Sequence, residues 1–291
     1  MKDLRQFVEV ANRRSISLAA QQLNISQSAL SRAVQKLEDS YGAPLFVRTG
    51  GGMELNACGS ALYGHALKIL PALDQAREEI EQLQGRSRAV LRIGAGDLWG
   101  LVILPEIIRQ FALSHPDVVV HMTIADEASR LEGLRNGTFD LVFGRLSTRY
   151  GPPLDVEFEA MTRHGTLVYC DQHHPLAKHD AITVEDLFEY RWISPGYDDA
   201  ADPVPLGRQQ RDFAVRVDTV MSALLLLKTS DFVMSASSGF SAMFRDFGVM
   251  EIPLEDLGPG SDSGAIYTPR ASARPTVTEF LETVRRAGIS R

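Results

Sequence analysis

Residues 26–35 carry a set of polar side chains of the kinds that read DNA. Glutamine can bond an adenine edge, arginine can bond guanine or a phosphate, and serine can bond either. At helical spacing five of these side chains fall on one outward face: Gln27, Ser28, Ser31, Arg32 and Gln35. Such a face alone is more often only the solvated side of a surface helix, so the segments around it decide the interpretation.

The preceding residues predict two helices that would support this face. Apolar residues recur at helical spacing over residues 4–11. Ser17 is expected to cap a second helix, in which Ala19 and Ala20 are small enough to let two helices cross closely. After a tight turn, Ser26 is expected to cap the third helix. The arrangement predicted is a helix-turn-helix unit, whose third helix presents the polar face.

The residues after the third helix predict a two-stranded β-wing. Apolar segments at 45–47 and 53–55 flank a tip of three glycines at 50–52. Arg48 and Thr49 stand at the end of the first strand, where they could add contacts to DNA. Together with the small-residue helix before it, this wing favours DNA recognition over a plain solvated face.

The charge distribution also favours contact with DNA at one end of the chain. The 291 residues carry a net charge of −7. Residues 1–60 hold seven Lys or Arg and five Asp or Glu, a net of +2, so the remainder carries −9. This balance argues against a protein that coats nucleic acid non-specifically, and it fits a positive module on an acidic body.

Residues 59–84 predict a long linker helix that pairs with a second copy of the chain. Apolar residues are spaced alternately four and three apart, as in a coiled-coil seam. They are Leu62, Ala66, Ile69, Leu73, Ala76, Ile80 and Leu83. Pro71 is expected to bend this helix and Gly85 to stop it, which places a domain boundary at residues 86–88.

From Val90 onward short apolar strands alternate with helices, a pattern typical of parallel α/β sheets covered on both faces. Roughly 200 residues allow one large sheet or two smaller lobes that share a cleft. No motif of a hydrolase, a P-loop or a zinc protease is present, and Gly94–Gly96 only weakly resembles a dinucleotide loop. Neither Cys58 and Cys170 nor the histidines near residue 174 form a metal-binding pattern, so no enzyme activity, metal or cofactor is expected.

The N-terminal motifs resemble those of LysR-type transcriptional regulators. The family pattern Ala-Ala-x-x-Leu-x-x-Ser-Gln-Pro-Ala-Leu-Ser is similar to residues 19–31, and its Pro-Leu-Phe-x-Arg is similar to residues 44–48. Two positions depart from the pattern, because Ser28 replaces the usual proline and Arg14 stands where glycine is frequent. The resemblance continues through residues 103–117, 137–141 and 174–177, so it covers nearly the whole chain.

The resemblance implies an overall α/β protein of three parts: a winged helix-turn-helix at 1–58, a linker helix at 59–85 and an effector-binding domain at 86–291. The last part is expected to resemble periplasmic binding proteins, with lobe I at about 88–162 and 268–291 and lobe II at about 163–267. The implied partners are double-stranded DNA, a small-molecule effector, a second copy of the chain in a dimer and then a tetramer, and RNA polymerase. No signal peptide or membrane span is recognisable, so a cytoplasmic bacterial protein is expected.

The family's effector site lies between the two lobes, and it maps onto residues that follow predicted strands. The candidates are Asp97, Leu98, Trp99, Asp126, Arg145, Tyr197 and Thr219. Relatives usually have Ser or Thr near the position of Asp97, whose carboxylate would repel an anion unless it were paired. Trp99 offers a flat ring face, and Arg145 would either clamp an anion or neutralise Asp97. Each candidate could instead belong to the core or the rim.

Two other functions fit the sequence less well. One is an enzyme or solute-binding domain with a structural N-terminal arm, against which the polar face of residues 27–35 argues. The other is a repressor that binds DNA constitutively and whose cleft no longer binds a ligand.

Overall fold

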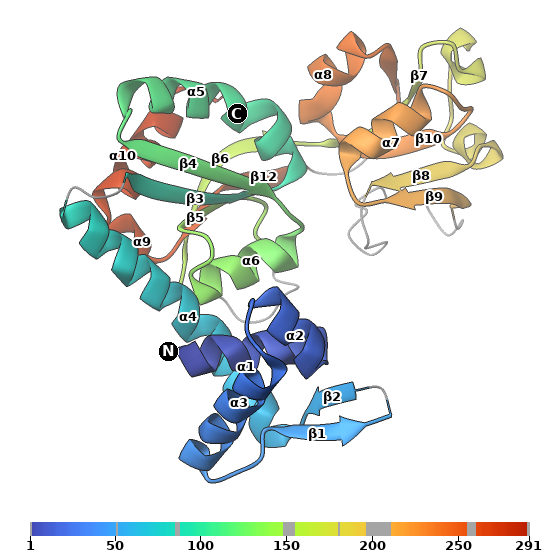
Figure 1. Ribbon diagram of the computed structural model, residues 1–291. Helices are drawn as coiled ribbons and strands as arrows, with labels where there is room; N and C mark the ends of the chain where they lie inside the picture. Colours follow the sequence, from blue (N-terminus) through green and yellow to red (C-terminus); the bar gives the residue numbers. More distant parts are fainter. Residues whose placement is uncertain are drawn as a thin grey trace. The chain divides into compact units, whose positions relative to one another are not determined.

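The computed structural model describes residues 2–50, 52–84, 88–147, 155–179, 181–195, 211–254 and 260–289. The chain divides into two compact units (Figure 1). The first comprises Met1–Arg88 together with Arg135–Thr138, and the second comprises Ala89–Leu134 and Phe139–Arg291. The junction at residue 88 coincides with the predicted boundary. In the described residues, no helix is long and apolar enough to cross a membrane.

The first unit begins with three helices around a small core. They are α1 (Lys2–Arg13), α2 (Ile16–Gln22) and α3 (Gln27–Tyr41). Phe7, Ala19 and Leu30 are fully buried where these helices meet, because alanine on α2 leaves room for close crossing. The cap of α2 differs from the prediction, since Ser15 rather than Ser17 accepts the hydrogen bond from the N–H of Leu18. Ser15 precedes the helix in extended conformation, as a capping residue must.

The wing and the linker helix complete the first unit. Strand β1 (Phe46–Thr49) pairs antiparallel with β2 (Gly52–Leu55), as predicted. Helix α4 (Ala57–Leu83) follows and contains Pro71 in its interior. Of the predicted seam, Ala66 is buried against the unit, whereas Ile69 and Ile80 are 46% and 56% exposed. The seam therefore leaves large apolar side chains uncovered on a single chain.

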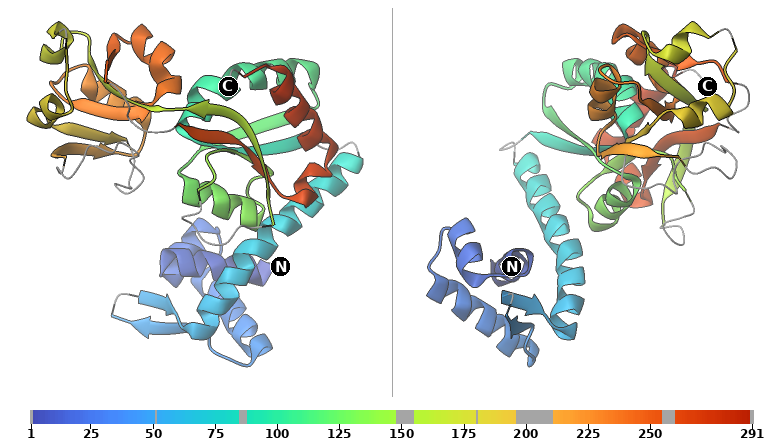
Figure 2. Two further views of the ribbon diagram at one scale, coloured as in Figure 1. Left: turned by 180° about the vertical axis from the view of Figure 1, so that it is seen from behind. Right: turned by 90° about the vertical axis from the view of Figure 1, so that its right-hand side faces the viewer.

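The second unit contains two five-stranded sheets, which form two lobes (Figure 2). The order in lobe I is β4 (Val118–Ile124), β3 (Ala89–Ala95), β5 (Leu141–Gly144), β12 (Ser261–Tyr267) and β6 (Glu157–His164). Strands β3, β4 and β5 run parallel, whereas β12 is antiparallel to both of its neighbours. The covering helices are α5 (Leu104–Ser114), α6 (Glu127–Asn136), α9 (Pro269–Ser272) and α10 (Pro275–Arg286).

Lobe II has the strand order β11 (Val249–Ile252), β7 (Thr166–Asp171), β10 (Val233–Ser237), β8 (Trp192–Pro195) and β9 (Phe213–Val217). Its parallel strands are β8, β9 and β10. The helices of this lobe are α7 (Val220–Leu227) and α8 (Ser241–Asp246), with short 3₁₀ turns at Pro175–Lys178, Glu185–Glu189 and Ser238–Phe240. The two-lobed alternative is therefore the observed one.

The predicted limits of the lobes need correction. Strand β12 lies between β5 and β6, so residues 261–267 belong to lobe I and not to lobe II. Lobe I also extends to His164, because the whole of β6 pairs with β12. Only Gly165 separates β6 from β7, and the chain passes from one sheet to the other there. Strand β11 forms one edge of the other sheet.

Candidate functional site

The polar face predicted on α3 is exposed in the structure. Ser26 caps the helix, and its hydroxyl accepts a hydrogen bond of 3.2 Å from the N–H of Ala29. Leu30 and Val34 are buried and fix the rotation of α3 about its axis. The opposite face then carries the predicted residues: Gln27, Ser28, Arg32 and Gln35 are exposed, and Ser31 is half-buried. The structure therefore brings all five to one surface.

The hydrogen bonds that these side chains make with described residues lie within the helix or at its cap, and all are exposed. The Arg32 Nε donates to the carbonyl of Ser28 at 3.3 Å, and the Gln35 amide donates to the Asp39 carboxylate at 3.0 Å. Both contacts are solvent-exposed, and exposed hydrogen bonds contribute little net free energy. Exchanging these contacts for hydrogen bonds to bases or phosphates would therefore cost little free energy.

The wing is fixed to the rest of the unit by hydrogen bonds that the sequence did not reveal. The carboxylate of Glu38, on α3, accepts from the backbone N–H groups of Leu45 at 2.7 Å and of Phe46 at 3.3 Å. The carbonyl of Arg14 accepts from the N–H of Met53 at 2.8 Å. Arg48 and Thr49 stay exposed at the end of β1, so the wing holds them beside its tip.

A cavity of about 760 Å³ in the second unit contains most of the predicted effector residues. It lies where the carboxyl ends of two sets of parallel strands meet, the place where open α/β sheets bind ligands. The loops after β3, β4 and β5 contribute from lobe I, and the ends of β8, β9 and β10 contribute from lobe II. Of the predicted residues, Asp97, Leu98, Trp99, Asp126, Arg145 and Thr219 line it. Tyr197 lies outside the described residues.

Asp97 is an acid of the cavity wall with a single hydrogen-bond partner. The backbone N–H of Val220, at the start of α7, hydrogen-bonds its carboxylate. No ion pair joins Asp97 to any residue that the structure describes. Burial raises the pKa of Asp97, and the Val220 hydrogen bond and the more distant charge of Arg130 only partly oppose this effect. The carboxylate therefore carries an uncompensated desolvation cost.

Arg130, on α6, is a cavity residue that the sequence analysis missed. Its side chain is only 6% exposed. Its Nε donates to the carbonyl of Ala125 at 3.1 Å, and its Nη1 donates to the carbonyl of Phe143 at 2.6 Å. A signal was present, because Arg130 is four residues before buried Leu134 and so shares the apolar face of its helix. Arginines on such a face are rare unless they are paired or functional.

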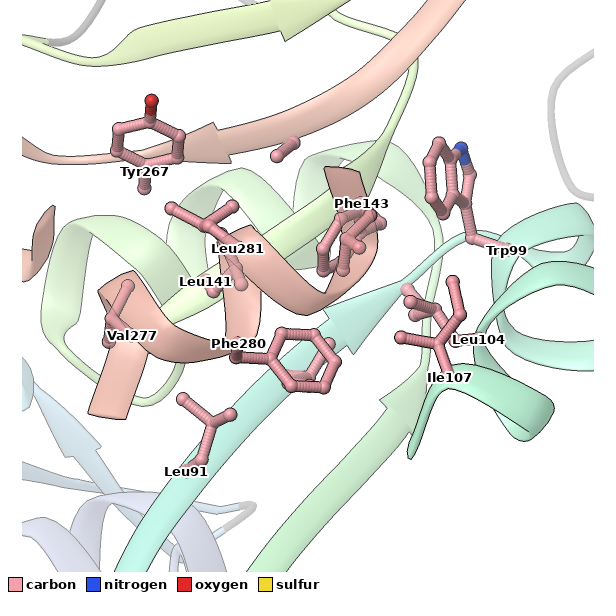
Figure 3. Packing of buried hydrophobic residues seen from close by; sticks show 14 of the residues in the cluster. Leu91, Trp99, Leu104, Ile107, Leu141, Phe143, Tyr267, Val277, Phe280 and Leu281 are labelled. Atoms are coloured by element: carbon pink, nitrogen blue, oxygen red, sulfur yellow. The ribbon is translucent and has the colours of Figure 1, made fainter. Parts of the chain in front are cut away.

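The prediction for the Trp99 ring was wrong. Trp99 is 1% exposed, and its ring packs 4.8 Å from the ring of Phe143 in the core of lobe I (Figure 3). Its indole N–H donates to the hydroxyl of Ser263 on β12. Trp99 lies in a π-helical turn, Trp99–Ile103, which directs the ring into the lobe. The residue borders the cavity, but its flat face is not available to a ligand.

The other predicted residues play supporting parts in the cavity wall. Asp126 immediately precedes α6 and accepts hydrogen bonds from the N–H of Ser129 at 2.9 Å and from its hydroxyl at 2.6 Å. Partial burial would raise the pKa of Asp126, but these hydrogen bonds hold it below its ordinary value. Thr219 caps α7 through a hydrogen bond from the N–H of Ser222. Arg145 is exposed on the rim and forms no ion pair with Asp97 in the structure.

Uncharged polar groups supply much of the remaining wall. His164 lines the cavity, and its Nε2 lies 2.8 Å from the hydroxyl of Thr162. Burial lowers the pKa of His164, which favours the neutral imidazole. Hydroxyls from both lobes lie along the wall: Thr166, Ser194, Thr219, Ser235, Ser237, Ser261 and Ser263. Within the described ranges no group of His, Cys, Asp and Glu is arranged to hold a metal ion.

Comparison with known proteins assigns both parts of the chain. Residues 1–60 match the profile of the bacterial regulatory helix-turn-helix protein, lysR family, and residues 84–288 match the LysR substrate binding domain. The HTH-type transcriptional regulator PcaQ of Agrobacterium fabrum is 28% identical over 98% of this chain and 94% of its own length. The uncharacterized HTH-type transcriptional regulator YdcI of Escherichia coli is 30% identical over 65% of this chain and 61% of its own length.

Solved structures share the fold over the full length. The LysR family regulator CbnR superposes with a TM-score of 0.74 at 20% identity and covers 99% of both chains. Full-length CbnR complexed with its target DNA gives a TM-score of 0.71 at 21% identity, covering 98% of this chain and 99% of that one. With a matching DNA-binding unit and a matching effector-binding domain, the chain belongs to the LysR family of transcriptional regulators, which bind DNA and respond to small-molecule effectors.

Proposed function

We propose that this regulator binds DNA through seven side chains of α3 and the wing. Gln27, Ser28, Ser31, Arg32 and Gln35 would face the major groove, while Arg48 and Thr49 would contact the backbone beside it. The observation that carries the proposal is the exposed polar face of α3, which the buried Leu30 and Val34 hold outward. Arg32 is the central residue, because one guanidinium can make two hydrogen bonds to guanine or to a phosphate.

The functional form would be a dimer joined along α4. Ile69 and Ile80 lie on one seam of this helix and expose large apolar side chains on the single chain. Covering them against a second copy would remove apolar surface from water and place two α3 helices at two half-sites. Two such dimers would pair into a tetramer on the DNA, and the bound protein would contact RNA polymerase there. The protein would act in the bacterial cytoplasm, where its DNA target lies.

The cavity of the second unit would hold the effector. Asp97, Leu98, Asp126, Arg145 and Thr219 stand at its wall, together with Arg130. Because these residues come from both lobes, a bound molecule would favour one arrangement of the lobes over others. That preference would change how the dimer engages DNA, as population shift requires.

The DNA-binding proposal is tested by selecting duplexes from a random library with the full chain and measuring affinity by fluorescence anisotropy. Arg32→Ala should weaken binding by about 1–3 kcal/mol, roughly 5- to 150-fold. Arg109→Ala removes an equal charge from an exposed site on α5 and is the matched control. Equal affinity of the two variants would contradict the role of α3.

The dimer is tested by sedimentation of the full chain carrying Ile69→Glu and Ile80→Glu together. The two charges should yield monomers and reduce the affinity for two-half-site DNA. Arg77→Glu changes an exposed residue of the same helix outside the seam and should leave the dimer intact. A dimer that survives both seam substitutions would show that pairing does not use this face.

A further inference from the structure

Two opposite charges enter the cavity from lobe I without forming an ion pair. Asp97 lies in the loop after β3, and Arg130 lies on α6. Each favours the charged form of the other through space. Neither, however, has an ion-pair partner among the described residues. Both groups have lost solvent, so each would gain from an opposite charge placed in the cavity.

Arg130 keeps one hydrogen-bonding arm free. Its Nε and Nη1 are used by the carbonyls of Ala125 and Phe143. Within the described ranges no acceptor bonds its Nη2. Arg130 nevertheless lines the cavity. Because no described acceptor bonds Nη2, this nitrogen can donate to a ligand oxygen while Nε and Nη1 keep their present hydrogen bonds.

Asp97 differs in this respect from the other two acids that interact with Arg130. Asp126 accepts two hydrogen bonds from Ser129 at the start of α6. Glu127 accepts the backbone N–H of Ser147 at 2.7 Å. Asp97 has only the single N–H of Val220. A carboxylate can accept several hydrogen bonds, so Asp97 has capacity left for a donor that carries positive charge.

We propose that the effector is a small aminocarboxylate zwitterion, whose protonated amine is bound by Asp97 and whose carboxylate is bound by the Nη2 of Arg130. This assignment rests on the proposed use of the cavity as the effector site. A dicarboxylate would place negative charge against Asp97, and a diamine would place positive charge against Arg130. Ser194 and Ser235 of lobe II also line the cavity.

The test uses two sets of matched probes with the full chain in calorimetry and thermal-shift measurements. L-alanine is compared with L-lactate, which lacks the amine, and with L-alaninol, which lacks the carboxylate. The four-carbon γ-aminobutyrate is compared with succinate and putrescine. In at least one set the aminocarboxylate should bind about tenfold tighter than both analogues, since tenfold corresponds to about 1.4 kcal/mol, the size of one charged hydrogen bond.

Variants test whether Asp97 is the residue that selects for the amine. Asp97→Asn should remove the preference for the amine. L-lactate and L-alanine, or succinate and γ-aminobutyrate, should then bind within about twofold of each other, instead of differing by about tenfold. Asp97→Ser is a second neutral variant in case the first fails to fold. Asp246→Asn removes an equal charge from the exposed end of α8 and should keep the wild-type preference.

Tighter binding of the diacid, of lactate or of either amine-only probe to the wild type would overturn the proposal. So would the absence of any preference or of any binding, because a cavity of about 760 Å³ excludes none of these probes by size. Anisotropy with the selected DNA is recorded on the same samples. If the protein binds DNA but prefers another class of ligand, only the zwitterion proposal is contradicted. If the protein does not bind DNA, the proposed function itself is contradicted.

Discussion

Gly144→Ala is expected to dislodge Arg130 and destabilise the effector-binding domain. Gly144 ends β5 with a φ of 155°, in the range that side-chain-bearing residues rarely adopt. A Cβ at this position would overlap the Nη1 of Arg130 and lie 2.6 Å from its Cζ. The guanidinium would have to leave the carbonyl of Phe143, to which it is bound in the native structure.

The magnitude follows from two losses. The backbone strain of a residue other than glycine in such a conformation costs about 1–2 kcal/mol. Losing one hydrogen bond of a buried charged group costs about 1.5–3 kcal/mol. The two losses are not fully additive, because a shift of the backbone that relieves the strain also moves the new Cβ away from Arg130. We therefore expect about 3 kcal/mol in total. For a domain of this size that is a fall in Tm of about 6–12 °C.

The matched control is Gly96→Ala, which also lies beside the Arg130 guanidinium. Its Cβ would lie 3.6 Å from the Cζ and Nη2 of Arg130, an ordinary contact, and its φ lies outside the positive range. Its effect should stay within about 0.5 kcal/mol. Urea unfolding of the full chain, followed by the fluorescence of buried Trp99 and Trp192, measures both. Equal destabilisation by the two substitutions would refute the clash with Arg130 as the cause.

Four further substitutions test other parts of the structure by equilibrium unfolding. Arg14→Gly should raise the free energy of unfolding by up to about 1 kcal/mol, because residue 14 has a φ of 50°, and a decrease would contradict strain there. Glu38→Gln should cost about 1 kcal/mol, since a neutral amide accepts the two wing N–H groups less strongly than a carboxylate. Arg274→Met should cost about 1.5–3 kcal/mol, because it removes the charged hydrogen bond between Arg274 and the buried carboxylate of Asp140, and an unchanged stability would show that this bond is dispensable. Burial raises the folded pKa of Asp97, so the stability contributed by its protonated form is present at low pH and is lost as pH rises through that raised value. Asp97→Asn should therefore be more stable than the wild type at neutral pH, and this advantage should vanish below the ordinary pKa of 3.8.

The DNA-binding unit was predictable because local patterns determine it. The helical spacing of its apolar residues, the Ser26 cap and the tip glycines each act within a few residues of the chain. The unit's internal ties were not predictable, because they join distant positions. Glu38 on α3 bonds the backbone of the wing, and the carbonyl of Arg14 bonds Met53. A polar residue on a helix gives no sign of which distant N–H it will meet.

The predicted limits of the lobes were wrong for a related reason. Strand β6 carries charged residues at alternate positions, because it is an edge strand, so its sequence lacks the apolar run of a buried parallel strand. Strand β12 returns from lobe II to pair between β5 and β6, and nothing within residues 261–267 specifies that sheet over the other. Sheet membership is a long-range property, and it was decided by packing rather than by local propensity.

The cavity shows which site residues a sequence can reveal. Asp97, Asp126 and Thr219 directly follow strands β3, β4 and β9, and the carboxyl ends of parallel strands gather at one edge, so position along the chain was enough to find them. Arg130 enters the cavity from the middle of a helix, and it fits because Gly144 has no Cβ that would overlap its guanidinium. Its place therefore depends on one distant glycine as much as on the arginine itself. For this reason the acid of the proposed zwitterion site was evident in the sequence, whereas the base that complements it required the structure.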